Sequence, residues 1–121
     1  RVMSSPSIFL KDMAGSVLGV WVAHGEGRFF CPDQDVVKEI ERKNLAPIRY
    51  ADDSGMIIED YPSNPNGSAL GITSLCSPDG RHLAMMPHPE RASEEILSSD
   101  DGKKIFLSMI SHIEHAKGVT C

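Results

Sequence analysis

Cysteine is scarce in this sequence, and its three copies, Cys31, Cys76 and Cys121, are widely spaced. An odd number of distant cysteines is a poor framework for disulfide bonds. The sequence also lacks a CxxC pair, so it does not predict a structural zinc site. We therefore expect reduced thiols and a cytoplasmic protein.

Long hydrophobic runs and basic clusters are also missing. The longest apolar run, residues 17–23, is far shorter than the ~20 residues that a membrane-spanning helix needs. No membrane association is expected, and no signal peptide is visible. Lys and Arg do not cluster and the net charge is −5, which argues against binding of nucleic acid. The chain begins at Arg1 rather than Met, so we expect a preceding segment in the parent protein.

The residues that are present fit a globular protein. Of the 121 residues, 40% are hydrophobic and 24% are charged, and the length fits one domain or part of one. Residues 17–23 are apolar and β-branched, which predicts a buried strand. Residues 33–43 predict a helix that Asp33 or Asp35 caps.

The second half of the chain predicts hairpins and a final helix. Strands are expected over residues 48–51 and 56–60, and again over 71–76 and 81–86, with a loop at 61–68. The order strand, helix, hairpin strands, helix predicts an α/β layer structure in which the front half of the sheet is missing.

A final amphipathic helix is predicted over residues 99–116. Asp100 or Asp101 is a candidate cap, and Gly118 lies where such a helix is expected to end. The predicted apolar stripe consists of Ile105, Phe106, Met109, Ile110 and Ile113.

The most informative motif is MMPHPER, residues 85–91. Pro89 favours an extended conformation for His88, and residues two apart in an extended chain point to the same side. His88 and Glu90 are therefore predicted to lie close together. A carboxylate beside a histidine fixes its tautomer and stabilises its charged form, which suits acid–base work beside a cysteine nucleophile. The alternative is a surface loop whose two polar side chains face water.

Two further stretches are candidates for binding a substrate. AHGEGR, residues 23–28, follows the predicted buried strand and contains His24 and Glu26. NPNGS, residues 64–68, contains Asn66 and could present amide groups to a ligand. Either stretch could also be a plain turn, because glycine and asparagine favour turns.

Neither a metal site nor a cysteine nucleophile is predicted. His24, His82 and His88 show no HExxH or comparable spacing. No cysteine lies on a glycine-flanked elbow between a strand and a helix, which is where nucleophiles of α/β enzymes are often found. The histidine–carboxylate pair thus stands without a visible partner.

The motifs AHGEGR, NPNGS and MMPHPER, in that order, closely resemble the glutaminase domain of the phosphoribosylformylglycinamidine synthases, a purine-biosynthesis family. The resemblance implies the C-terminal part of a class I glutamine amidotransferase domain over residues 1–121, α/β, with a mixed sheet, flanking helices and hairpin strands. It implies a Cys-His-Glu triad in which His88 and Glu90 supply the last two members. The half that carries the cysteine is absent, so the chain alone is not expected to hydrolyse glutamine.

The resemblance also implies partners. Ammonia from glutamine would pass to a synthetase domain, where ATP and Mg²⁺ are expected to bind; no cofactor is expected in this chain. One departure is that residues 92–102 are short and polar, where larger family members are expected to be rich in aromatics. Two competing hypotheses are a non-catalytic binding or regulatory module on the same fold and a histidine metal-binding domain.

Overall fold

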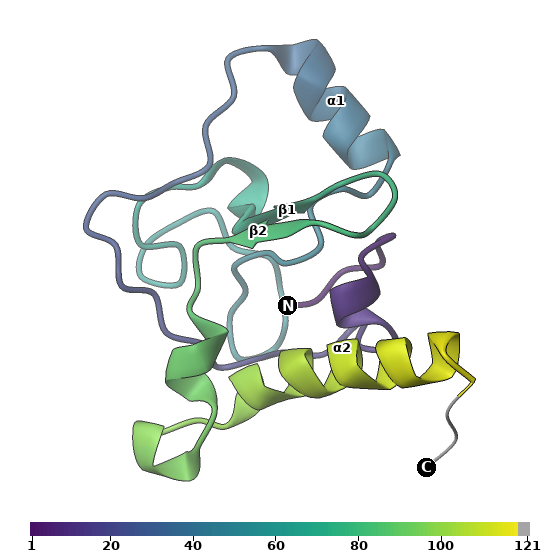
Figure 1. The fold of residues 1–121 in the computed structure, drawn as a ribbon. Coiled ribbons are helices and arrows are strands. Elements are labelled where there is room, and N and C mark those ends of the chain that lie inside the picture. The colour runs from purple at the N-terminus through teal and green to yellow at the C-terminus, as the bar shows by residue number, and fades with distance from the viewer. Residues whose placement is uncertain (119–121) are drawn as a thin grey trace.

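The computed structural model describes residues 1–118. In this part of the chain two α-helices, α1 (Gln34–Arg42) and α2 (Asp101–Ala116), accompany an antiparallel hairpin of strands β1 (Ser74–Cys76) and β2 (Leu83–Met85). In Figure 1 the hairpin lies between the two helices, so the α/β prediction is confirmed. Short 3-10 helices complete the element list: η1 (Ile8–Leu10), η2 (Ala69–Gly71), η3 (Pro89–Ala92) and η4 (Glu95–Leu97).

The β1–β2 hairpin forms where the sequence predicts it, although both strands are shorter than expected. Leu75 pairs with Ala84 at its centre. In the turn, the Ser77 hydroxyl donates a hydrogen bond of 2.5 Å to the Asp79 carboxylate. Gly80 has φ +72°, and a Cβ added there would lie 2.0 Å from the carbonyl oxygen of Pro6. The turn therefore requires glycine both for its backbone conformation and for space.

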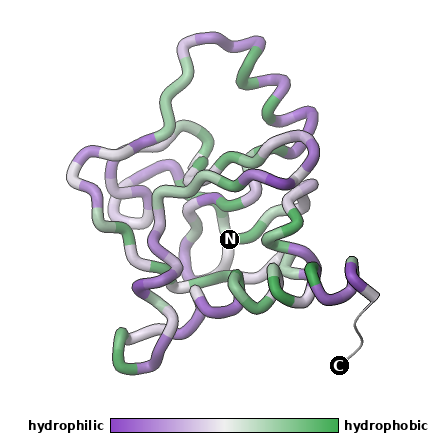
Figure 2. Tube along the Cα trace, viewed as in Figure 1, coloured by the Kyte–Doolittle hydropathy of each residue, from purple (hydrophilic) through white to green (hydrophobic). Residues whose placement is uncertain are grey.

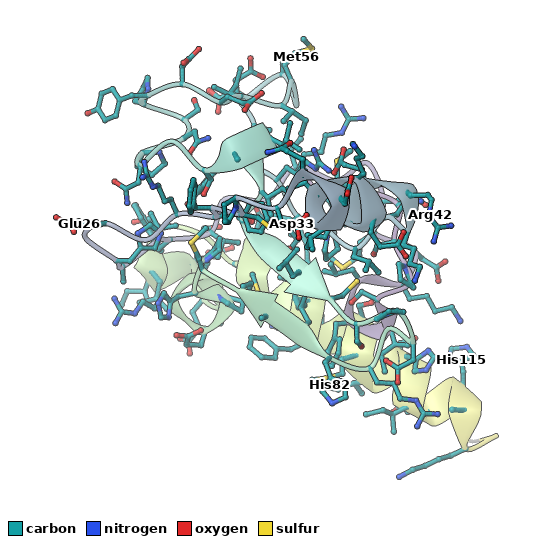
Figure 3. All side chains as sticks on the ribbon, turned by 90° about the horizontal axis from the view of Figure 1, so that it is seen from above. Glu26, Asp33, Arg42, Met56, His82 and His115 are labelled. Atoms are coloured by element: carbon teal, nitrogen blue, oxygen red, sulfur yellow. The ribbon has the colours of Figure 1, made fainter. Side chains whose placement is uncertain are left out.

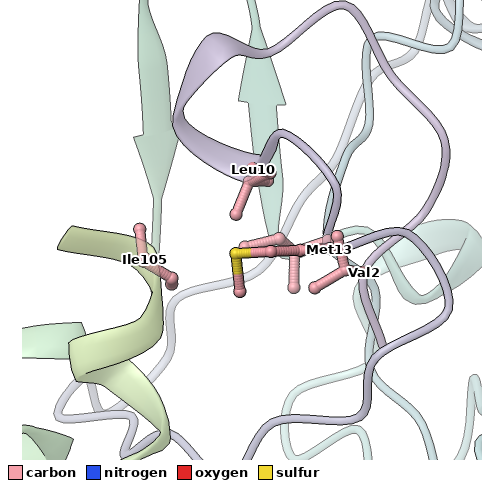
Figure 4. Close-up of a cluster of buried hydrophobic side chains, with 5 residues drawn as sticks. Val2, Leu10, Met13 and Ile105 are labelled. Carbon is pink, nitrogen blue, oxygen red and sulfur yellow. The ribbon is translucent and has the colours of Figure 1, made fainter. Parts of the chain in front are cut away.

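Two small hydrophobic clusters form the core. The first consists of Val2, Leu10, Met13, Ile48 and Ile105, most of which Figure 4 shows around the sulfur of Met13. Leu83 and Met85 of β2 pack against this cluster. The second cluster consists of Ile40, Ala46 and Ile72, with Leu75 of β1 against it. Because strand neighbours point to opposite faces, the hairpin serves both clusters.

The predicted buried strand at residues 17–23 is wrong. This segment is irregular, and the side chains of Val17 and Trp21 are 46% and 52% exposed. Its pairing is limited to one antiparallel bridge, between Trp21 and His88. A strand needs a ladder of partners along its length, and the described residues offer this segment only that one.

The predicted hairpin around residues 52–55 forms a turn closed by a single bridge, without the two predicted strands. Ala51 and Ile57 make an isolated bridge, and the amide of Gly55 donates to the carbonyl of Asp52 to close the turn. Arg49 bridges Ile72 in the same manner. These bridges are isolated pairs and form no further strands within residues 1–118.

Both predicted helices are confirmed, with differences at their ends. Asp33 caps α1, since its carboxylate accepts from the amides of Asp35 and Val36. Neither Asp100 nor Asp101 caps α2 through its side chain. The hydroxyl of Ser99 accepts from the amide of Asp101 instead.

The apolar stripe predicted for α2 is only partly buried. Hydrophobic and hydrophilic residues alternate along this helix in Figure 2. Ile105 is 4% exposed, whereas Phe106, Ile110 and Ile113 are 38%, 49% and 44% exposed. The stripe is wider than the face that contacts η1 and η3, so one flank of it stays outside.

Candidate active site

His88 and Glu90 form a direct pair. The Nδ1 atom of His88 lies 2.6 Å from Oε1 of Glu90. His88 has extended backbone angles, φ −105° and ψ 92°, and Pro89 begins η3 directly after it. Proline restricts the preceding residue to this region, so the sequence fixes the local geometry. Glu90 lies in the first turn of η3, so a turn rather than a continuous extended chain brings the carboxylate to the ring.

The electrostatics of the pair favour an ionised carboxylate. The hydrogen bond from His88 is the largest cause that lowers the pKa of Glu90 below its ordinary 4.5, and backbone hydrogen bonding adds to it. When Nδ1 carries the proton that Glu90 accepts, Nε2 is left with a free lone pair. The two side chains are 38% and 59% exposed, so the ring is accessible to a reacting group.

The backbone around the pair is held by three hydrogen bonds. The His88 amide donates to the Trp21 carbonyl at 2.7 Å, and the Arg91 amide donates to the His88 carbonyl at 3.0 Å. The Ser93 hydroxyl donates to the Glu90 carbonyl at 3.0 Å. The pair thus lies on a short fixed turn and not on a loose surface loop.

A second cluster joins the other two motifs. The side-chain amide nitrogen of Asn66 lies 3.2 Å from Nδ1 of His24 and donates to the Gly27 carbonyl at 3.1 Å. The Phe29 amide donates to the Ser68 hydroxyl at 2.8 Å. The structure therefore brings AHGEGR and NPNGS together as two loops in direct contact.

Within this cluster the three candidate residues differ in exposure. The Nε2 atom of His24 is buried and has no hydrogen-bond partner within the described chain. Glu26, Arg28 and Asn66 line a pocket of about 330 Å³. Figure 3 shows Glu26 at the outer edge of its loop. His24 therefore supports the loop from inside, while Glu26 and Asn66 are open to a ligand.

The sequence analysis did not find two residues that support the pair. Trp21 supplies the carbonyl that holds His88, and its indole Nε1 donates to the Leu97 carbonyl at 2.9 Å. Gly102 of α2 is buried directly against the carbonyl of Pro89. An apolar run and a helical glycine carry no local signal for either contact.

The described cysteines, Cys31 and Cys76, are partly or fully buried. Burial raises the pKa of the Cys76 thiol, which disfavours a reactive thiolate. Cys31 is half-buried and its thiol donates to the Asp33 carbonyl, while Cys121 lies outside the described residues. Across residues 1–118 no three His, Cys, Asp or Glu side chains converge to hold a metal ion. No helix in this range is long and apolar enough to cross a membrane.

Comparisons with known proteins identify the family of the chain. The model of the CobB/CobQ-like glutamine amidotransferase domain family matches residues 1–112. Phosphoribosylformylglycinamidine synthase of Dictyostelium discoideum is 61% identical over 92 residues, which is 76% of this chain and 7% of that protein. The human synthase is 52% identical over 92 residues, again 76% of this chain and 7% of the relative.

Two further matches extend the comparison. A protein of Arabidopsis thaliana named as a probable chloroplastic or mitochondrial phosphoribosylformylglycinamidine synthase is 62% identical over 90 residues, 74% of this chain and 6% of that protein. The structure of PurLQS from Thermotoga maritima superposes with a TM-score of 0.66 at 28% identity, covering 93% of this chain and 44% of that one. The chain therefore spans only a small part of these relatives, and it belongs to the family of CobB/CobQ-like glutamine amidotransferase domains.

Proposed function

We propose that His88 and Glu90 are two members of a Cys-His-Glu glutaminase triad. Residues 1–121 are the C-terminal portion of an amidotransferase domain, and the half with the nucleophilic cysteine lies outside this chain. The observation that carries the proposal is the 2.6 Å pair of His88 and Glu90 on a turn with fixed backbone hydrogen bonds. The family match over residues 1–112 supports it.

The chemistry of the pair would then proceed in two steps. The cysteine thiolate attacks the side-chain amide carbon of glutamine, and His88 protonates the nitrogen that leaves as ammonia. A thioester remains. His88 next takes a proton from water, the hydroxide attacks the thioester, and glutamate and the thiolate are released. Glu90 keeps the ring oriented and stabilises its charged form through Nδ1.

In the whole protein, ammonia would pass to a synthetase domain. There, ATP-activated formylglycinamide ribonucleotide would be converted to the amidine, as the names of the curated relatives suggest. ATP and Mg²⁺ would bind that synthetase domain. Two cysteines without a disulfide, Cys31 and Cys76, support a reducing compartment such as the cytoplasm.

The first test replaces His88 with Ala in the intact parent protein. We expect glutamine-driven amidine formation to fall by about 10³-fold or more, since acid and base catalysis are both removed. Activity driven by an ammonium salt should remain within twofold of the unaltered protein. His82→Ala is the matched control, because His82 is an exposed histidine beyond the β1–β2 turn. Survival of glutamine-driven activity in His88→Ala would show that the assignment of His88 to the triad is wrong.

We propose further that Glu26 and Asn66 contact glutamine, with His24 supporting them. Their pocket combines the Glu26 carboxylate, the Arg28 guanidinium and an amide. This set matches the ammonium and carboxylate of an amino acid.

The substrate pocket has its own test. Asn66→Ala and Glu26→Gln should each raise KM for glutamine about tenfold, the effect of losing ~1.4 kcal/mol of binding, and leave ammonia-driven activity unchanged. Gln34→Ala, which removes an exposed side-chain amide at the start of α1, is the control for Asn66→Ala. An unchanged KM in both pocket variants would place glutamine elsewhere.

A further inference from the structure

The position of His88 depends on one backbone hydrogen bond from a neighbouring segment. Its amide donates to the Trp21 carbonyl at 2.7 Å, in the isolated antiparallel bridge between these residues. Because this is a single bridge and not a ladder, no neighbouring backbone pairs help to hold the two segments together. The contacts that hold Trp21 in place therefore also hold the start of the His88–Glu90 turn.

Trp21 is fixed by its side chain and not by burial. The residue is 52% exposed, yet its indole Nε1–H donates to the Leu97 carbonyl at 2.9 Å. Leu97 ends η4, which follows η3 along the chain. Residues 88–97 and the two hydrogen bonds of Trp21 thus close a ring that contains both His88 and Glu90.

The segment that leads to Trp21 is tied to the same part of the chain. The Ser99 hydroxyl donates to the Gly19 carbonyl at 2.6 Å, and the Gly19 amide donates to the Asp101 carboxylate at 2.8 Å. These contacts join positions about 80 residues apart in sequence. They hold residues 19–21 against the entry to α2 from two sides.

The first turn of α2 also abuts the turn that carries the pair. A Cβ added to Gly102 would lie 2.1 Å from the carbonyl oxygen of Pro89 and 2.8 Å from that of Ala92. Gly102 is buried, so η3 rests against the backbone of the helix. Only a residue without a side chain permits this approach.

We propose that Trp21 and Gly102 are positioning residues for His88. The carbonyl of Trp21 accepts from the His88 amide, and the indole of Trp21 is held in turn by the Leu97 carbonyl. On the other side, Gly102 lets α2 pack against the turn at Pro89. Reaction at a bound amide requires the imidazole within a fraction of an ångström of its productive place. The inference rests on the proposed glutaminase function, because it assigns a role in placing that imidazole.

The test uses Trp21→Phe in the intact parent protein, which keeps an aromatic ring but removes the Nε1–H donor. We expect kcat for glutamine hydrolysis to fall about tenfold, KM for glutamine to stay within twofold and ammonia-driven activity to be unchanged. Tyr61→Phe is the matched control, since it removes a polar hydrogen from an aromatic residue that is 81% exposed. It should leave all three quantities unchanged.

Gly102→Ala gives a second, independent measurement. The added methyl group must push η3 away, so we expect kcat for glutamine hydrolysis to fall by more than it does in Trp21→Phe, with ammonia-driven activity retained. If kcat is unchanged in both variants while His88→Ala is inactive with glutamine, the positioning role is wrong. The proposed glutaminase function is then unaffected. An equal loss of glutamine-driven and ammonia-driven activity would also overturn it, because that pattern reports general damage. Glutamine-driven activity in His88→Ala would remove the proposed function itself.

Discussion

At the scale of the residue, the direction of the His88 ring is set by which nitrogen faces Glu90. Nδ1 lies against the carboxylate, and this leaves Nε2 for proton transfer. The carboxylate is itself exposed, so its value to the site is orientation more than a strong ion pair. A glutamine in place of Glu90 would keep the shape and lose the charge that stabilises the protonated ring.

The lowered pKa of Glu90 leads to a prediction at this scale. Because the folded pKa lies below the ordinary 4.5, the pair contributes stability above that value and loses it as pH falls through the folded pKa. In an NMR titration of the chain, the Glu90 carboxyl should titrate below 4.5. His88→Ala should return its pKa toward 4.5, since the largest cause is then absent. Identical titration curves with and without the ring would contradict the assigned hydrogen bond.

At the scale of the element, the β1–β2 turn meets the N-terminal segment closely. The Ile8 amide donates to the Gly80 carbonyl at 3.0 Å, and Pro6 leaves no space for a Cβ on that glycine. The turn therefore anchors residues 6–8 to the hairpin. This contact links the first cluster of the core to the strand that leads to His88.

Gly80→Ala should be markedly destabilising. The alanine must adopt φ near +72° and also clash with Pro6, so we expect a loss of about 2–5 kcal/mol in the free energy of unfolding. Gly15→Ala is a matched control, because Gly15 has φ +91° with open space around its Cβ position. It should cost only ~1–2 kcal/mol. Denaturant unfolding of both variants measures the difference, and equal losses would show that the Pro6 contact is unimportant.

The elements that sequence reasoning found are those that local chemistry determines. Asp33 caps α1, Pro89 extends His88, and the turn over residues 77–80 joins two short strands. Residues 17–23 failed as a strand because strand formation depends on neighbours that a local pattern does not reveal. The motif around Pro89 predicts that His88 and Glu90 lie close together, and the structure confirms this pair. The contact between His24 and Asn66 was not predicted.

Trp21 and Gly102 could not have been found in the same way. Trp21 contacts His88 and Leu97 from far along the chain, the latter at a separation of 76 residues. Gly102 is nearer in sequence, but its contact with Pro89 depends on how α2 packs against η3. Neither residue belongs to a motif with polar chemistry. The packing contacts around His88 and Glu90 therefore could not be predicted from the sequence alone.

At the scale of the whole molecule, the described chain leaves a large amount of apolar surface uncovered. Trp21 is about half exposed, Phe30 and Ile96 are 71% and 87% exposed, and one flank of α2 adds Phe106 and Ile110. Where such side chains lie together in one patch, they usually mark contact with other protein.

The β1–β2 hairpin determines where His88 lies. β2 ends at Met85, three residues before His88, and its Leu83 and Met85 pack against the first hydrophobic cluster. A slip of β2 by a single residue would turn both side chains to the opposite face. The same slip would carry the His88 amide away from the Trp21 carbonyl. The burial of Leu83 and Met85 thus fixes the register of β2, and with it the position of the imidazole of His88.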